Sequence, residues 1–464
     1  MNQNLTEGNP RRVLWRFSIP MFISVIFQQL YNMADSIIAG RFAGEDALAA
    51  IGASYPITMI FMAIAVGSNI GCSVVISHLF GAKRYRELKT AVSTTLLASL
   101  VLSLVLTGLG LAGNSLMMTL IQTPQNIFCD GELYLGIYIG GFAFLFLYNV
   151  CTGIFQSLGD SKTPLYFLIG SSIGNILLDW IFVAFFGWGV AGVAWATFLA
   201  QGVACVLSLV TLRKRIKAIP TDGPVPRFSW DMLGQVSRIA IPSILQQSFI
   251  SVGNILIQGL INSCGSSVIA GYSAAIKLNT FTITSFTTLA NGVSSFTAQN
   301  MGAGRHDRVK AGFRAGSIMS LGVAAVFFAV LFFFSGDMIR LFMSEESPTA
   351  METGITFLHI VPPFYFVICM KLIADGVLRG AGCMMQFMVA TFTDLVLRVI
   401  LSFILFRFWD TMGIWLSWPI GWTVAMLVSV AFYASGRWKK SRMASPAEEA
   451  GPLAEAVVEA EAAE

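Results

Sequence analysis

Twelve long apolar runs dominate the chain, and each is long enough to cross a lipid bilayer as a helix. A membrane helix needs about 20 mostly apolar residues, because the hydrocarbon core is about 30 Å thick. The chain is also 55% hydrophobic and only 12% charged, which is outside the usual range of water-soluble proteins. We therefore predict an all-α, polytopic membrane protein. The predicted spans are 13–39, 48–74, 91–119, 131–158, 164–186, 190–212, 236–260, 268–295, 310–334, 353–379, 386–408 and 413–436.

The positions of the basic residues predict how the spans are oriented. All but six of the 29 Lys and Arg residues lie at the N-terminus, in the loops that follow even-numbered spans, or at the C-terminus. Cytoplasmic loops of membrane proteins are enriched in Lys and Arg. We therefore expect both termini on the cytoplasmic side of a bacterial inner membrane. The six exceptions are Arg41, Arg340 and Arg407 in the other loops and Lys277, Lys371 and Arg398 within spans.

The chain repeats itself, which predicts two homologous halves. The segment "SIPMFISVIFQQ" from Ser18 matches "AIPSILQQ" from Ala240, and "HLFGAKRYRELKTA" from His78 matches "QNMGAGRHDRVKAG" from Gln299. A third match joins "FQSLGDSKTP" from Phe155 to "LRGAGCMM" from Leu378. Because each half holds six spans, the two halves have the same orientation and are expected to be related by a pseudo-two-fold axis along the membrane normal.

This repeat predicts five segments of different character. Two six-helix bundles, at 13–212 and 236–437, are joined by a cytoplasmic linker at 213–235 that contains three prolines. A short cytoplasmic N-terminus, 1–12, precedes the first bundle. The last residues, 438–464, are rich in Ala and Glu, and we expect a disordered acidic tail there.

Four acidic residues lie in the interior of predicted spans, four or more residues from either end, where an ionisable group costs about 2.5 kcal/mol or more. In the second half, Asp375 follows Lys371 by four residues, and Asp394 precedes Arg398 by four. Each of these acids thus has a cation one helical turn away. The two pairs are either structural or part of a secondary charge network. Lys277 is a further candidate for that network, near the cleft or paired with Asp375, and the alternative is that its side chain extends to the membrane surface.

No such cation accompanies the two acids of the first half, Asp35 and Asp179. Asn175 lies one turn before Asp179, and Thr197 on the next span adds a hydroxyl at a similar depth. Two carboxyl groups, an amide oxygen and a hydroxyl suit a proton or a small hard cation such as sodium. We predict that these four residues bind a coupling ion, and the alternative is that they only bond one another within the bundle.

Motifs for other kinds of chemistry are missing from the sequence. It contains no GxxxxGK[ST] phosphate-binding loop, no HExxH zinc motif and no nucleophile elbow. We therefore expect no direct use of ATP, no enzymatic activity and no cofactor or metal beyond a possible sodium ion. The basic residues are explained by the membrane and do not indicate nucleic acid.

The sequence resembles the multidrug and toxic compound extrusion family over about residues 11–440. The resemblance rests on several segments: "DSIIAGRFAGEDALAAIGASYPI" from Asp35, "GAKR" from Gly81, "FQSLGDSKTP" from Phe155, "GNILLD" from Gly174, "GVAGVAWATFLAQ" from Gly189 and "AQNMGAG" from Ala298. It implies two six-helix bundles that form a V, with alternating access driven by sodium or proton entry. It also implies that Asp35, Asn175, Asp179 and Thr197 form the ion site of a prokaryotic branch, and that Pro20 marks a bend in the first helix.

One feature of the sodium-coupled branch is missing. The chain has Gln246 and Gln247 where that branch carries an acid on the seventh helix, and Asn254 takes the place of Asp35 in the second half. We therefore predict the coupling site in the first half.

The resemblance implies a monomeric antiporter that exports amphipathic, often cationic, organic compounds in exchange for protons or sodium. Two alternatives remain open. A flippase of a lipid-linked or polysaccharide precursor has the same fold, and a channel or receptor would lack coupled transport.

Overall fold

The computed structural model describes residues 4–221, 223–342 and 348–440, and every regular element in this part of the chain is a helix. The first half contains α1 (Pro10–Ile38), η1 (Ala39–Ala43), α2 (Glu45–Gly81), α3 (Tyr85–Ala112), α4 (Asn114–Leu120), α5 (Gln125–Gly140), α6 (Phe142–Ser157), α7 (Lys162–Asp179), η2 (Trp180–Phe185) and α8 (Gly189–Lys217). The second half contains α9 (Trp230–Asn262), α10 (Ser266–Gly302), α11 (His306–Phe333), α12 (Ser335–Arg340), α13 (Pro348–Ile360), η3 (Pro362–Phe364), α14 (Tyr365–Gly380), α15 (Met384–Ala434) and η4 (Arg437–Lys440).

These helices provide the twelve spans that the apolar runs predict. Within the described residues, nine helices are long and apolar enough to cross a membrane, and the pair α5 and α6, bent by 46°, makes a tenth span. The helix α15 provides two spans, because its backbone leaves the helical conformation at Trp409 and Asp410. The twelfth span is α10, whose 37 residues cover about 55 Å at 1.5 Å per residue.

The sequence of α10 is polar because the helix is buried inside the protein. It contacts α13, α14 and α11 of its own half and α1 and α2 of the other half. Several of its hydroxyl groups donate to carbonyls of the same helix, as when Thr282 donates to the Leu278 carbonyl and Ser285 to the Phe281 carbonyl. A helix with such neighbours needs no lipid-facing apolar surface.

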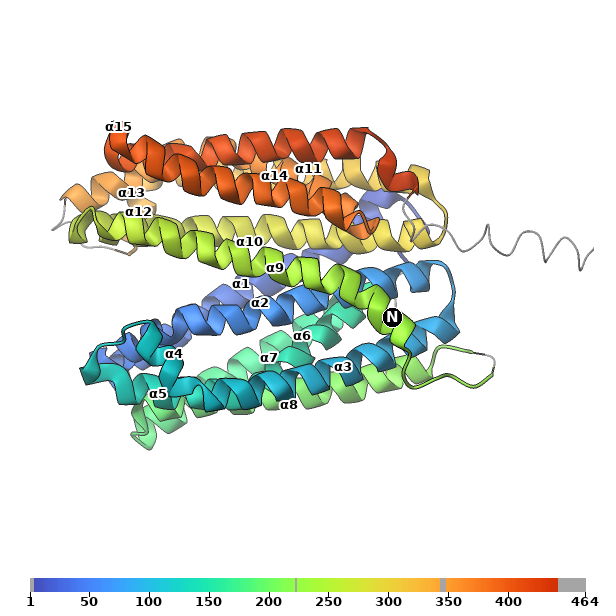
Figure 1. Cartoon of the computed structure of the whole chain (residues 1–464), viewed down its shortest axis with the longest axis horizontal. Helices are drawn as coiled ribbons and strands as arrows, with labels where there is room; N and C mark the ends of the chain where they lie inside the picture. The colour runs from blue at the N-terminus through green and yellow to red at the C-terminus, as the bar shows by residue number, and fades with distance from the viewer. Residues whose placement is uncertain (1–3, 222, 343–347, 441–464) are drawn as a thin grey trace, which may run out of the picture.

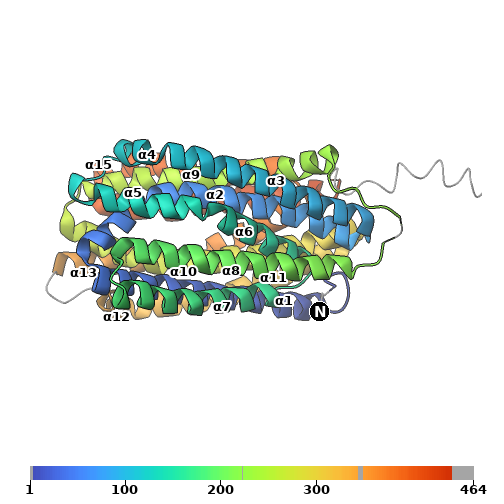
Figure 2. The same cartoon turned by 90° about the horizontal axis from the view of Figure 1, so that it is seen from below.

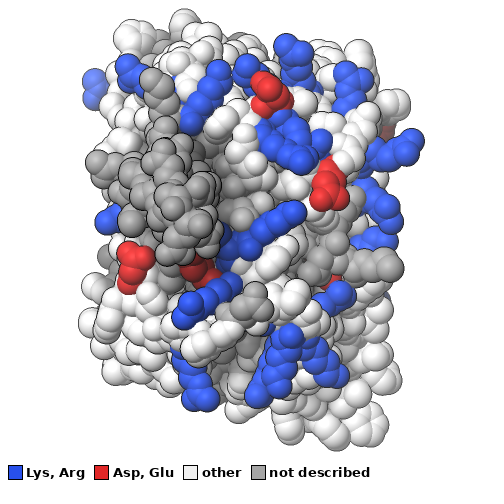
Figure 3. Space-filling view, turned by 90° about the vertical axis from the view of Figure 1, so that its right-hand side faces the viewer, with Lys and Arg blue, Asp and Glu red and all other residues white. Residues whose placement is uncertain are grey.

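All spans run side by side, so the molecule has two ends (Figures 1 and 2). The basic end is formed by residues 4–9, the turns at 82–84 and 303–305, the segment 218–229 and residues 435–440. Lys and Arg side chains are spread over this end and outnumber Asp and Glu there (Figure 3). The opposite end carries α4, α12 and the turns at Gly44, Gly187 and Gly265. The positive charge thus gathers at one end, as the loop pattern predicts.

The two halves contact each other through α1 and α2 on one side and α9, α10 and α11 on the other. Small residues allow the closest approaches. A Cβ atom at Gly71 would lie 2.5 Å from the Cβ of Ala240, and one at Gly302 would lie 2.0 Å from the carbonyl oxygen of His78. Both places lie in the half of the helices nearer the basic end, because α2 and α10 end there and α9 begins there.

The apolar core is divided in the same way. One core joins buried residues of both halves toward the basic end, among them Leu14, Val75, Ile239 and Val293, and within the first half it continues to Met118 of α4. Toward the opposite end, the second half has its own core around Trp415, and the first half has a small one around Val183. The halves therefore pack together at the basic end and have separate cores at the opposite end.

The segment between the halves is shorter than the predicted linker 213–235, because α8 continues to Lys217 and α9 begins at Trp230. Basic residues are favourable in the last turn of a helix, where the dipole is negative. The remaining segment is fixed to α3. Arg86 Nε donates to the Pro224 carbonyl (3.1 Å), and Lys89 Nζ donates to Thr221 Oγ1 (2.9 Å).

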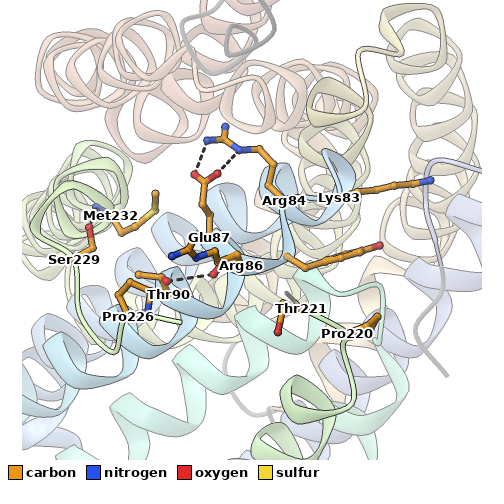
Figure 4. A pocket seen from close by; sticks show the side chains of 11 residues that line it. Lys83, Arg84, Arg86, Glu87, Thr90, Pro220, Thr221, Pro226, Ser229 and Met232 are labelled. Atoms are coloured by element: carbon orange, nitrogen blue, oxygen red, sulfur yellow. Dashed lines mark hydrogen bonds and ion pairs between the residues drawn. The ribbon is translucent and has the colours of Figure 1, made fainter. Parts of the chain in front are cut away.

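A surface cleft of about 560 Å³ lies between this segment and the start of α3 (Figure 4). Its charged rim includes Arg86 and the ion pair of Arg84 with Glu87. At the C-terminus, Trp438 is buried and donates from Nε1 to the Tyr433 carbonyl (3.0 Å), so residues 437–440 belong to the folded protein rather than to the predicted tail. The rest of that predicted tail, 441–464, lies outside the described residues.

Candidate functional site

The structure brings together the two acids of the first half, which come from different helices. Asp35 lies near the end of α1, and Asp179 is the last residue of α7 and is fully buried. Their carboxyl groups interact directly, close enough to form a hydrogen bond. Carboxylate oxygens only accept hydrogen bonds, so such a contact requires a proton on one of the two groups. The geometry therefore suits one proton shared by two carboxyl groups.

Asn175 and Thr197 complete the group of four residues that the sequence predicts. When the Asn175 amide is oriented to satisfy its neighbours, its Nδ2 donates to Asp179 Oδ2 (2.8 Å) and its Oδ1 accepts from the Thr197 backbone N–H (3.1 Å). The spacing of four residues places Asn175 and Asp179 on the same face of α7. Thr197 lies on α8 and contacts them across the interface between α7 and α8.

Two tyrosines also belong to this site, and neither was among the predicted residues. The Tyr31 hydroxyl is directed at the Thr197 side chain and lies near Asp35, and Tyr134 of α5 lies near both acids. Tyr31 precedes Asp35 by four residues, so helical spacing could have identified it. Nothing in the sequence links Tyr134 to the acids, because only the packing of α5 against α8 brings it close.

Pro20 lies inside α1, which continues through it as one helix. Its ring cannot donate a backbone hydrogen bond, and Ser24 Oγ donates to the Pro20 carbonyl (2.9 Å). The predicted bend at Pro20 therefore remains a prediction. The same helix carries Gln28, a cavity residue, about 10 Å from Asp35 along the axis at 1.5 Å per residue.

A cavity with two lobes lies between the halves. The first lobe, about 510 Å³, is lined mainly by α1, α2, α6, α7 and α10, and the second, about 370 Å³, by α9, α10, α14 and α15. The lobes share a wall that includes Ile70, Gln247, Asn291 and Arg379. Asp35 and Asp179 are absent from the described lining of both lobes. The acid pair is thus separate from the cavity, and α1 connects the two.

Most of the charged residues predicted for the second half line its lobe, and one of the two predicted ion pairs forms. Lys371 Nζ forms the predicted ion pair with Asp375 (2.9 Å), and Asp375 also accepts from Ser429 (2.6 Å). The predicted pair of Asp394 with Arg398 is wrong. The Arg398 guanidinium instead lies 4.5 Å from the centre of the Trp418 ring, because the second part of α15 folds back and presents this aromatic face.

Lys277 does not belong to this network. Its side chain is exposed, and its Nζ lies 5.9 Å from the centre of the Phe342 ring, at the opposite end of the molecule. The proposed pairing of Lys277 with Asp375 is therefore wrong, since Asp375 is bound by Lys371 and Ser429.

Arg379 is the cavity residue that sequence reasoning missed. It lies at the end of α14 and is the last residue of the predicted span 353–379, and it is 6% exposed and lines both lobes. Its Nη2 donates to Asn291 Oδ1 (2.5 Å), and its Nε donates to Ser294 Oγ (3.4 Å). The repeat offered a signal, because Arg379 matches Gln156, which lines the first lobe.

Comparison with known proteins agrees with this architecture. The MatE family profile matches the chain twice, over residues 20–181 and 242–404, which confirms the predicted repeat. The probable multidrug resistance proteins YpnP and YoeA of Bacillus subtilis strain 168 are 28% and 26% identical to the chain; each alignment covers 95% of the chain, and 98% and 97% of the relatives.

A solved structure of a MOP superfamily transporter from Pyrococcus furiosus has the same fold. It superposes with a TM-score of 0.87 at 24% identity, over 95% of this chain and 98% of that one. The fold, the two-fold match of the profile and the relatives agree with one another. The chain belongs to the multidrug and toxic compound extrusion (MATE) family, a family of multi-pass membrane transporters rather than enzymes.

Proposed function

We propose that this chain is a secondary active antiporter that exports amphipathic organic compounds and takes up protons through Asp35 and Asp179. The observation that carries this proposal is the contact between the two carboxyl groups, which lie apart from the cavity but on the helix that lines it. Moving one charge down 100 mV releases about 2.3 kcal/mol, which is enough to support a substrate gradient.

The contact between the carboxyl groups supports a proton rather than sodium as the coupling ion. Two neighbouring carboxyl groups repel each other when both are ionised, and a proton on one of them removes that repulsion. Protonation removes a buried negative charge and so changes the free energy of each state of the transporter by a different amount. Helix α1 is the element that would transmit this change to the cavity.

The orientation in the membrane is part of the proposal. Because Lys and Arg gather at the basic end, we place that end and both termini in the cytoplasm of a bacterial inner membrane. The halves pack tightly at this end and have separate cores at the other. The conformation is then the one in which the cavity is closed toward the cytoplasm.

The test is gradient-driven transport into inside-out vesicles, with pH and sodium gradients imposed separately. Both a cationic and an anionic xanthene dye are offered, so that the result does not depend on the charge of the substrate. We expect an acid interior to drive dye accumulation in the parent and expect Asp35→Asn to abolish it. The matched control is Asp231→Asn, which removes an exposed acid of α9 at the basic end.

Four outcomes separate the possibilities. Transport driven by sodium alone would replace the proton with sodium in the proposal. Transport that persists in a folded, inserted Asp35→Asn variant would remove Asp35 from coupling. Dye movement that no gradient influences would favour the channel, and movement of labelled lipid without dye transport would favour the flippase.

A further inference from the structure

The second lobe of the cavity contains more positive than negative groups. Five charged side chains line it, and each is less than a tenth exposed. Three are cations and two are acids, so whichever way they are paired, one positive charge remains. These residues are Lys371, Asp375, Arg379, Asp394 and Arg398.

The pairing within the lobe shows which cations are available to a ligand. Lys371 is occupied by Asp375. Arg379 is held only by neutral groups, the Asn291 amide and the Ser294 hydroxyl. Arg398 lies over the Trp418 ring, and its buried Nε has no hydrogen-bond partner. Two arginines thus face the cavity without a carboxylate bound to them.

The first lobe does not compensate for this charge. Its described lining contains one charged residue, Arg379, which it shares with the second lobe, and its other polar groups are amides and hydroxyls such as Gln28, Asn69 and Thr152. The cavity as a whole therefore has the same net charge as the second lobe alone.

Aromatic rings line the second lobe beside these arginines. Tyr272, Phe387, Trp418 and Trp422 contribute to its wall, and the Arg379 guanidinium lies 5.6 Å from the centre of the Phe387 ring. Flat apolar surfaces next to guanidinium groups suit a ligand with a planar apolar body and an acidic group.

We propose that the second lobe binds an amphipathic organic anion, with its carboxylate, sulfonate or phosphate group at Arg379 and Arg398. This inference rests on the proposed export function and defines the substrate class of the same cavity. A buried charge without a counter-ion is costly, and an anionic ligand supplies that counter-ion. A cationic ligand would meet both arginines and, in the described lining, only one acid that is not bound to a cation, Asp394, since Asp375 is already bound by Lys371 and Ser429.

The test compares two dyes that share a xanthene ring, the anion fluorescein and the cation rhodamine 123. Their binding to the purified full-length protein in a neutral detergent is measured by fluorescence polarisation, without any ion gradient. We expect fluorescein to bind at least about tenfold more tightly than rhodamine 123. Arg379→Gln and Arg398→Gln should each weaken fluorescein binding about tenfold, since each removes a charge-assisted hydrogen bond.

The control variants keep the test specific to charge in the lobe. Asp394→Asn removes an acid from the same lobe and should strengthen fluorescein binding. Arg407→Gln removes an exposed arginine from α15 and should change nothing. If Arg379→Gln does not fold, as judged by gel filtration, Arg379→Lys keeps the charge and should bind fluorescein more tightly than rhodamine 123. Tighter binding of rhodamine 123 by the parent, or unchanged fluorescein binding in folded Arg379→Gln and Arg398→Gln, would overturn the proposal.

Two further measurements complete the design. Asp35→Asn should retain fluorescein binding, so a failure of ion coupling and a failure of anion binding are distinguishable. A soluble anion and an anionic lipid share the required chemistry, and short-chain phosphatidylglycerol tests the lipid. If it displaces fluorescein more effectively than matched phosphatidylcholine, the anion is a lipid headgroup; equal, weak displacement assigns the lobe to a soluble compound.

Discussion

At the scale of single residues, the cluster around Asp35 and Asp179 gathers buried polar groups, and the Oδ1 atoms of both acids have no hydrogen-bond partner among the described residues. Asp179 is fully buried and has three polar neighbours, the Asp35 carboxyl, the Asn175 amide and, nearby, Tyr134. Tyr31 adds a hydroxyl at Thr197. Each buried polar group that loses its partner costs about 1–3 kcal/mol. The tyrosines should therefore influence how well the acids exchange a proton without contacting the substrate.

We expect Tyr31→Phe to slow proton-driven export about fivefold while leaving dye binding unchanged. The substitution removes one hydroxyl beside Thr197, and a single hydrogen bond is worth about 1 kcal/mol. Transport in inside-out vesicles and fluorescence polarisation of the bound dye measure the two properties separately. The control is Tyr166→Phe, because Tyr166 lies on α7 with its side chain 65% exposed. A loss of dye binding in Tyr31→Phe would show that Tyr31 acts through the cavity instead.

The ion site was predictable from the sequence to the extent that spacing along one helix defines neighbours. Four-residue spacing placed Asn175 beside Asp179 and Lys371 beside Asp375 correctly. The same rule failed for Arg398, because Trp418 lies in a segment of α15 that folds back after Asp410. Contacts between helices, such as those of Arg379 with α10, depend on packing that no local pattern records.

At the scale of elements, the N-terminal residues 4–8 hold the basic end closed. The Leu5 side chain is fully buried, and its backbone N–H donates to Gln299 Oε1 of α10 (3.0 Å). Gln299 Nε2 donates in turn to the Ser157 carbonyl at the end of α6 (2.7 Å), so this chain of bonds joins the two halves. Arg308 of α11 donates to the carbonyls of Leu5, Glu7 and Gly8.

Arg308→Gln should therefore loosen the basic end. Its guanidinium makes several hydrogen bonds to the segment, and those involving a charged group are worth about 1.5–3 kcal/mol each. Spin labels at Lys83 and Lys310, with Cys129 replaced by Ser, report the distance between the halves by pulsed electron resonance. We expect a broader distribution that extends to longer distances in Arg308→Gln. Lys310 carries a label and cannot serve as the control, so the control is Lys217→Gln at the exposed end of α8. An identical distance distribution in the parent, Arg308→Gln and Lys217→Gln would refute the role of residues 4–8.

The helices were largely predictable, because the length of an apolar run and the basic residues of a loop can both be recognised within a short stretch of sequence. The spans were recognised wherever lipid faces the helix. The span 268–295 was predicted as well, although α10 is polar because helices surround it. The end of α8 was not, since this helix extends past Leu212 with a basic last turn that is stable in water. The packing of residues 4–8 could not be foreseen, since it depends on a surface formed by α6, α10 and α11.

At the scale of the whole molecule, the two halves carry their charges at different positions of the repeat. The repeated segments match Gln156 with Arg379, and continuing this match without a gap sets Asn175 against Arg398 and Asp179 against Ser402. Asn254 stands where the first half has Asp35. At these positions the first half thus has two neighbouring acids, whereas the second half has arginines and a Ser402 hydroxyl bonded to Ser417 (2.7 Å).

This asymmetry predicts that ion coupling depends on one half only. Asp179→Asn should abolish proton-driven transport, whereas Ser402→Ala, at the matching position, should retain it within about twofold, because Ser402 has no charge to exchange and loses only one hydrogen bond of about 1 kcal/mol. The dependence of the parent's transport rate on proton concentration should fit a single site. A folded and inserted Ser402→Ala variant that lost coupling as completely as Asp179→Asn would contradict this prediction. The second half would then have to contain an ion site of its own, and the assignment of the proton site to one half and the anion lobe to the other would be wrong.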